Sequence, residues 1–220
     1  MLVTEYLRND IRPLGPLDLV DEAHQTMDDY KVSHLPVVDN GHYLGMVTED
    51  DLLNAESEKL SVKDGSTQLI RTSIEPDRHI FDALSLFHIQ HLSMLPVVDE
   101  KGGYHGYLYP EDIVDLLGGD LSFSGPGGII VLEVNINDYH LSEVAQIVES
   151  NDAKILALYL SSVPDSTKLE LTLRINNTDL SRILETFNRY NYTILASYHQ
   201  SLHAMDLKDR FDAFMKYLNM

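Results

Sequence analysis

The chain has 220 residues, no cysteine and a formal net charge of −19, from 35 acidic and 16 basic side chains. The lack of cysteine excludes disulfides, thiolate zinc sites and cysteine nucleophiles, and so large an acidic excess disfavours nucleic acid and anionic membrane as partners. The sequence has neither the pattern of a signal peptide nor an apolar run of the roughly 20 residues that span a bilayer, so we expect a cytoplasmic protein.

An internal repeat organises the first half of the chain. The stretch SHLPVVDNGHYLGMVTEDDLL at 33–53 returns in altered form as SMLPVVDEKGGYHGYLYPEDIVDLL at 93–117. The hairpin loop is one residue longer in the second copy, so that Gly45 corresponds to Gly106. Because both copies carry the same series of patterns, the sequence predicts two successive units of one fold.

Each copy shows the same elements in the same order. Residues that mark a helix recur at i, i+3, i+4 and i+7; they are Val20, Ala23, His24 and Met27 in the first copy and Ile80, Ala83, Leu84 and Phe87 in the second. The runs that follow predict strands, and Asn40-Gly41 predicts a tight hairpin. We therefore predict two β-α-β-β-α repeats, at 1–60 and 61–118.

The second half of the chain has a different organisation. The glycine-rich segment GGDLSFSGPGG indicates a linker, which we place at 119–128. The patterns beyond it predict a βαββαβ unit at 129–200, which is the ferredoxin-like order. The last segment, 201–220, carries apolar side chains on one helical stripe, so we predict an amphipathic helix that packs on its own domain or on a partner. The fold class is α/β (α+β).

Thr48 and Asp51 admit two interpretations. A threonine before a short helix, with an acidic residue three positions later, is close to a capping box and stabilises a helix start by about 1 kcal/mol. The same geometry suits a ligand, because a helix start directs N–H groups at a phosphate. The threonine hydroxyl could then donate to that phosphate, while the carboxylate accepts from two ribose hydroxyls.

The doubled pattern S-x-x-L-P-V-V-D … G-x-x-x-x-x-D-[LI] resembles a pair of CBS domains, over roughly residues 1–118. Residues 129–200 resemble an ACT domain by the order of their elements, and the CBS–CBS–ACT order is similar to that of acetoin-utilisation accessory proteins. The resemblance implies a regulatory protein that binds AMP, ADP, ATP or S-adenosylmethionine between its CBS halves and requires no other cofactor. It also implies pairing of ACT-like domains across subunits, so we expect a homodimer.

The resemblance further implies which residues surround the ligand. These residues are Thr48, Asp51, His34, Leu35, Pro36, Thr67 and Thr72. Thr48 would contact the phosphate, Asp51 the ribose, and the backbone of the Pro36 strand the adenine edge. The two threonines of the 67–72 segment would come from the opposite half, which leads into the second copy.

The second copy departs from the family pattern. Asp112 keeps the carboxylate, but Tyr109-Pro110 stands where Thr48-Glu49 stands in the first copy. Tyrosine is a poor N-cap, and its bulk would crowd a phosphate. Asp112 is therefore either structural or part of a second site for a ligand without phosphate, such as adenosine or S-adenosylmethionine. We expect one competent site per chain.

The ACT-like half departs from its pattern as well. Amino-acid-binding members of that family carry a glycine in the first strand-to-helix turn, whereas the turn here reads NINDYH at 135–140. The missing glycine leaves two interpretations open for this domain, an amino-acid site or a module for dimerisation.

No catalytic or metal constellation is visible in the sequence. It contains no hydrolase, zincin or P-loop motif, and His88 and His91 lack a partner from a second segment. We therefore expect neither an enzyme nor a metal site. Two hypotheses remain: a sensor whose state is read through the ACT-like domain or a protein partner, and a constitutive dimerisation scaffold with no functional ligand site.

Overall fold

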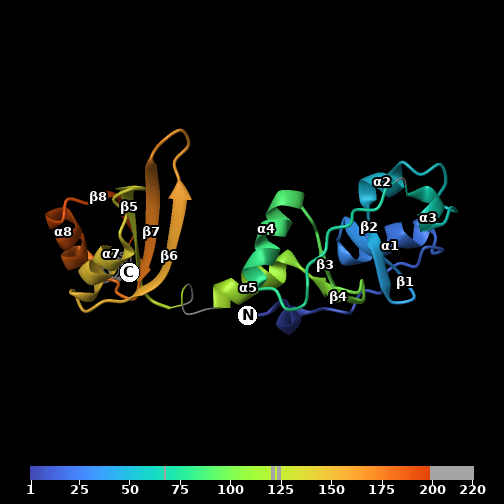
Figure 1. The fold of residues 1–220 in the computed structure, drawn as a ribbon, viewed down its shortest axis with the longest axis horizontal. Helices are drawn as coiled ribbons and strands as arrows, with labels where there is room; N and C mark the ends of the chain where they lie inside the picture. The colour runs from blue at the N-terminus through green and yellow to red at the C-terminus, as the bar shows by residue number, and fades with distance from the viewer. Residues whose placement is uncertain (67, 120–121, 123–124, 199–220) are drawn as a thin grey trace, which may run out of the picture. The chain divides into compact units, whose positions relative to one another are not determined.

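The computed structural model describes residues 1–66, 68–119, 122 and 125–198. The chain divides into two compact units, Met1–Leu116 and Leu117–Met220, each of which is described by itself (Figure 1). Thr67 and the predicted C-terminal helix at 201–220 lie outside the described residues. Among the residues that are described, no helix is both long and apolar enough to cross a membrane.

The first unit contains the predicted repeat. The first copy consists of α1 (Val20–Tyr30), β1 (His34–Asp39), β2 (His42–Thr48) and α2 (Glu49–Leu53), and the second of α4 (Ile80–Gln90), β3 (Leu95–Val98), β4 (Tyr104–Leu108) and α5 (Pro110–Gly119). A 3₁₀ helix, η1 (Val3–Tyr6), and a short helix, α3 (Val62–Gly65), precede the respective copies. The mixed α/β class and the hairpin of each copy are confirmed.

The first strand of each repeat is reduced to a single parallel bridge. Leu14 pairs with Val37, and Ile74 pairs with Val97. Pro13 and Pro16 flank the first of these bridges, and proline has no N–H with which to extend a ladder. The segments that lead into the two copies, 8–14 and 66–74, are called the leading segments below.

The two copies exchange their leading segments. Ile70 forms two backbone hydrogen bonds with Met46 of β2, at 2.7 and 2.9 Å, although it belongs to the second copy. Arg8 of the first copy does the same with Tyr107 of β4, at 2.9 and 3.1 Å. Each hairpin therefore gains a backbone partner from the other copy.

Glycine occurs at the same position of both hairpins because the exchanged backbone comes so close. Gly45 and Gly106 have φ angles of +147° and +141°, which L-residues rarely adopt. A Cβ on Gly45 would lie 2.6 Å from the Cβ of Leu69, and one on Gly106 would lie 2.5 Å from the carbonyl oxygen of Arg8. The lack of a side chain at these two positions thus leaves room for the leading segments.

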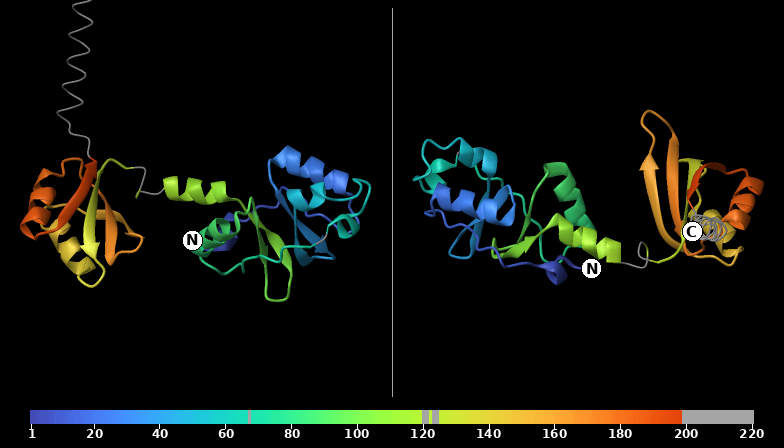
Figure 2. Two further views of the ribbon diagram at one scale, coloured as in Figure 1. Left: turned by 90° about the horizontal axis from the view of Figure 1, so that it is seen from above. Right: turned by 180° about the vertical axis from the view of Figure 1, so that it is seen from behind.

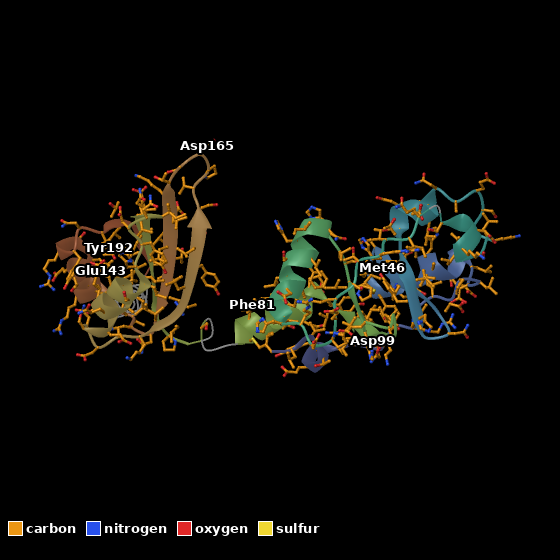
Figure 3. All side chains as sticks on the ribbon, viewed as in Figure 1. Met46, Phe81, Asp99, Glu143, Asp165 and Tyr192 are labelled. Carbon is orange, nitrogen blue, oxygen red and sulfur yellow. The ribbon has the colours of Figure 1, made fainter. Side chains whose placement is uncertain are left out.

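The hydrophobic core of the first unit also joins the copies. Met94 and Tyr107 of the second copy are fully buried in the same cluster as Val20, Leu35 and Val47 of the first. Met46 of β2, labelled in Figure 3, is fully buried as well. Because this core draws on both copies, the repeat folds as a pair.

The second unit has the predicted ferredoxin-like order. Its elements are β5 (Gly128–Asn135), α7 (Leu141–Glu149), β6 (Ile155–Ser162), β7 (Lys168–Ile175), α8 (Ser181–Arg189) and β8 (Thr193–Tyr198). They form an antiparallel sheet in the order β6-β7-β5-β8, with both helices on one face (Figure 2). Alternate residues of β5 are buried against Val144 and Phe187, and the Tyr192 hydroxyl donates to Glu143 at 3.1 Å (Figure 3).

Gly45→Ala tests the close approach of the exchanged segment. The new methyl group would meet Leu69 and the carbonyl of Ile70 at a positive φ, so we expect a loss of about 2–3 kcal/mol in the free energy of unfolding, measured with urea. Gly41→Ala is the matched control, because Gly41 also has a positive φ but nothing within 4 Å of its Cβ position; it should lose only about 1 kcal/mol. Equal losses would show that the approach contributes nothing.

Candidate functional site

Three backbone segments lie side by side at the first hairpin. In the β1–β2 ladder, His34 pairs with Thr48 and Pro36 pairs with Met46. Met46 in turn pairs with Ile70 of the exchanged leading segment. The strand around Pro36, the end of β2 and the opposite half thus lie side by side. The region around Thr48 and Asp51 is called the first cleft below. Leu35 of β1 is fully buried.

Thr48 is the N-cap of α2. Its Oγ1 accepts a hydrogen bond from the backbone N–H of Asp51 at 3.0 Å. A hydroxyl group that accepts in this way still has its own proton to donate. Capping and ligand contact by Thr48 are therefore compatible, and the two interpretations of this motif need not exclude each other.

The carboxylate of Asp51 is contacted from the opposite half of the repeat. The hydroxyl of Ser66, in the second leading segment, donates to Asp51 Oδ2. The resemblance implied that this segment contributes Thr67, which lies outside the described residues, and Thr72. Ser66 was missed because nothing in its spacing distinguishes it from an ordinary loop serine.

Thr72 is held against the first hairpin by its backbone. The Tyr43 hydroxyl donates to the carbonyl oxygens of Thr72, at 2.8 Å, and of Ile70, at 3.3 Å. The Thr72 hydroxyl itself donates to Gln90 of its own copy. Burial raises the pKa of Tyr43, so the phenol stays a donor at neutral pH. Tyr43 was not among the predicted site residues.

His34 connects the two copies at the other end of the cleft. Its Nδ1 accepts from the backbone N–H of Ser93 at 3.3 Å and lies 3.1 Å from the hydroxyls of Ser33 and Ser93. Burial lowers the pKa of His34, opposed in part by the charge of Asp50. The imidazole is thus held neutral, with Nδ1 as an acceptor.

The corresponding region around Tyr109 and Asp112, called the second cleft below, is built differently. The carboxylate of Asp112 forms a bidentate pair with Arg8, in which Nε lies 2.7 Å from Oδ2. The guanidinium also lies over the ring of Tyr109, 5.2 Å from its centroid. The side chain of Asp112 is only 15% exposed. The carboxylate that corresponds to Asp51 is therefore engaged by a cation of the chain itself.

A second contact fixes the first leading segment against the second hairpin. The buried Tyr107 donates to Asp10 Oδ1 at 2.6 Å, and this hydrogen bond lowers the pKa of Asp10. The rings of Tyr107 and Tyr109 meet edge to face at 5.0 Å. The roles of Arg8 and Asp10 could not be predicted from the sequence, because their partners lie about a hundred residues further along the chain.

The first turn of the second unit is closed by its own asparagine. The backbone N–H of Asn137 donates to Asn135 Oδ1 at 3.0 Å, and that of Asp138 donates to the Asn135 carbonyl at 3.0 Å.

Elsewhere in the described ranges, the rings of His88 and His91 lie 6.5 Å apart. No group of three or more metal-binding side chains occurs within the part of the chain that the structure describes.

The low pKa of His34 predicts a pH dependence of stability. Because burial lowers the folded-state pKa of His34 below the ordinary histidine pKa of about 6.5, the unfolded chain binds the proton more readily. The free energy of unfolding should therefore fall as the pH falls through about 6.5. His34→Asn keeps an acceptor near the position of Nδ1 but cannot titrate. Urea unfolding between about pH 7 and pH 5 should show a smaller fall for the variant. Identical pH profiles would contradict the buried neutral imidazole.

Known proteins are similar to about half of this chain. Inosine-5'-monophosphate dehydrogenase of Methanocaldococcus jannaschii is 33% identical over 111 residues, which cover 50% of this chain and 22% of that protein. Homoserine O-acetyltransferase of Methanococcoides burtonii is 37% identical over 101 residues, which cover 45% of this chain and 20% of that protein. The chain therefore matches only about a fifth of the length of these relatives.

The chain is also similar to a solved structure and matches a protein family. The crystal structure of a CBS domain pair/ACT domain protein from Thermotoga maritima is 28% identical, covers 55% of this chain and 99% of that chain, and has a TM-score of 0.49. Residues 3–58 and 66–119, which make up half of the chain, each match the CBS domain. The chain therefore belongs to the CBS domain family, of which it carries a tandem pair.

Proposed function

We propose that the CBS pair binds one adenosine-containing ligand per chain in the first cleft, and that the protein is a regulatory sensor and not an enzyme. The observation that carries this proposal is the difference between the two equivalent carboxylates. Asp51 is contacted by the neutral hydroxyl of Ser66, whereas Asp112 is paired with the guanidinium of Arg8.

This difference decides which carboxylate a ribose can reach. At Asp51, the ribose hydroxyls would replace the Ser66 hydroxyl, a neutral donor of the same kind. At Asp112, they would have to replace a bidentate guanidinium, and charge-assisted hydrogen bonds are roughly twice as strong as neutral ones. Displacing Arg8 would also leave a partly buried carboxylate and a cation without their partners, which is costly. Ligand is therefore expected at Asp51.

The remaining groups of the first cleft suit the rest of an adenosine ligand. The Thr48 hydroxyl can donate a hydrogen bond to a phosphate, and the backbone around Pro36 can contact the adenine edge. Glu49, Asp50 and Asp51 place three carboxylates in the first turn of α2, and their repulsion increases with the negative charge of the ligand. We therefore expect AMP or S-adenosylmethionine to bind more tightly than ATP.

The exchanged leading segments explain how ligand binding at Asp51 could change the arrangement of the two copies. A ligand on Asp51 would contact the first copy directly and the second copy through its leading segment. It would thus favour those arrangements of the two copies in which both sets of contacts are made, which is a population shift. The ferredoxin-like unit, as a dimerisation module, or a protein partner would then read the change.

A thermal-shift series with AMP, S-adenosylmethionine and ATP tests the proposal. Ligand at 100 times its Kd stabilises the folded state by about 2.7 kcal/mol, which raises the Tm of a chain of this size by roughly 5–10 °C. Asp51→Ala should abolish the shift, whereas Asp112→Ala, the matched control, should retain it relative to its own ligand-free Tm.

Two outcomes would contradict this assignment. If none of the three compounds shifts the Tm at millimolar concentration, the sensor is excluded and the constitutive scaffold, which the internally paired second cleft also favours, becomes the better account. If Asp112→Ala abolishes the shift and Asp51→Ala does not, the ligand occupies the other cleft.

A further inference from the structure

A second cavity lies beside the first hairpin, outside the cleft described above. It has a volume of about 410 Å³, within the range of roughly 300–1,000 Å³ that is typical of small-molecule sites. Leu69 and Arg71 of the second leading segment line it. They alternate with Ile70 and Thr72, which form backbone contacts with the hairpin, and alternate residues of an extended segment face opposite sides.

The wall of this cavity is largely apolar. Val37 and Leu44 contribute from the hairpin and Leu69 from the leading segment. Val37 is almost fully buried, whereas Leu44 keeps 37% of its surface exposed. An apolar ligand group placed against these side chains would therefore remove exposed hydrocarbon surface from water.

Charges of both signs surround the apolar wall. Lys63 and Arg71 line the cavity, and neither forms an ion pair with any residue that the structure describes. Asp39 lines it as well, at the end of β1. Its carboxylate accepts from the side chain of Asn40 at 2.9 Å and retains further acceptor capacity.

We propose that this cavity binds a zwitterion with an apolar body, and specifically an α-amino acid with an apolar side chain. Its carboxylate pairs with Lys63 and Arg71, and its ammonium group pairs with Asp39. The side chain packs on the apolar wall. A simple organic anion would leave Asp39 opposed to the ligand, and a simple amine would leave the two cations without a partner, so the zwitterion suits all three charges.

The cavity adjoins the candidate nucleotide cleft through one residue. Ser66 lines the cavity and also donates to Asp51. The charged groups assigned to the amino acid take no part in the proposed contacts with adenosine, so each site can be tested while the other is disabled.

An NMR titration of the ¹⁵N-labelled full chain with L-phenylalanine and L-leucine tests the proposal. We expect saturable shifts at the amides around Asp39, Leu44 and 68–71. The analogues 3-phenylpropionate, which lacks the ammonium group, and phenethylamine, which lacks the carboxylate, should each bind about tenfold more weakly than phenylalanine, because each loses a charge-assisted contact.

Matched variants test which charged side chains of the cavity contact the ligand. The double variant Lys63→Gln/Arg71→Gln should weaken phenylalanine binding by about tenfold or more, whereas Lys59→Gln, a nearby exposed lysine that does not line the cavity, should leave the Kd unchanged. Asp39→Asn should weaken phenylalanine but not 3-phenylpropionate. The dispersion of the amide spectrum reports whether each variant is folded.

Several results would overturn the proposal. These are the absence of saturable shifts with both amino acids, equal binding of phenylalanine and 3-phenylpropionate, or shifts confined to the 135–140 turn of the second unit. Loss of phenylalanine binding in Asp51→Ala would place the ligand in the nucleotide cleft instead. A failure of AMP to bind in the same samples would reject the sensor while leaving the amino-acid site intact.

Discussion

The exchange of leading segments between the two copies is the constraint on which the first unit depends. Each hairpin takes a backbone partner from the other copy, Met46 from Ile70 and Tyr107 from Arg8. Glycine is required at both crossings because a Cβ there would overlap the incoming chain. The core follows the same rule, since side chains of both copies are buried in one cluster. Neither copy can therefore complete its own packing.

The same exchange gives two equivalent clefts different chemistry. In each cleft a leading segment of the opposite copy brings a side chain to the carboxylate that follows β2 or β4. The second segment brings Ser66 to Asp51, and the first brings Arg8 to Asp112. The two equivalent carboxylates thus differ in the side chain that the opposite copy brings to them, a hydroxyl at Asp51 and a guanidinium at Asp112.

The sequence predicted the features that arise from local patterns. Helical spacing located α1 and α4, Asn40-Gly41 located the first hairpin, and the order of elements predicted the ferredoxin-like sheet. The contact between Thr48 and Asp51 was also foreseen, because it spans a single helical turn.

The sequence could not predict the contacts that the exchange creates. Ser66 with Asp51, Arg8 with Asp112 and His34 with Ser93 join residues that are far apart in the chain, and neither spacing nor residue type links them beforehand. The departure at Tyr109-Pro110 did indicate that the second cleft is unusual. The pairing of Asp112 with Arg8 could not be predicted from it, because the first leading segment meets the second hairpin only in the folded chain.

The stoichiometry of binding, measured by isothermal titration of the intact chain with AMP and with S-adenosylmethionine, tests this account most directly. The proposed ligand site at Asp51, together with the pairing of Asp112 with Arg8, predicts one adenosine ligand per chain. Two equivalent sites per chain would contradict the account, because the Arg8–Asp112 pair would then fail to close the second cleft. No binding of either compound would show that the Asp51 cleft is not a nucleotide site.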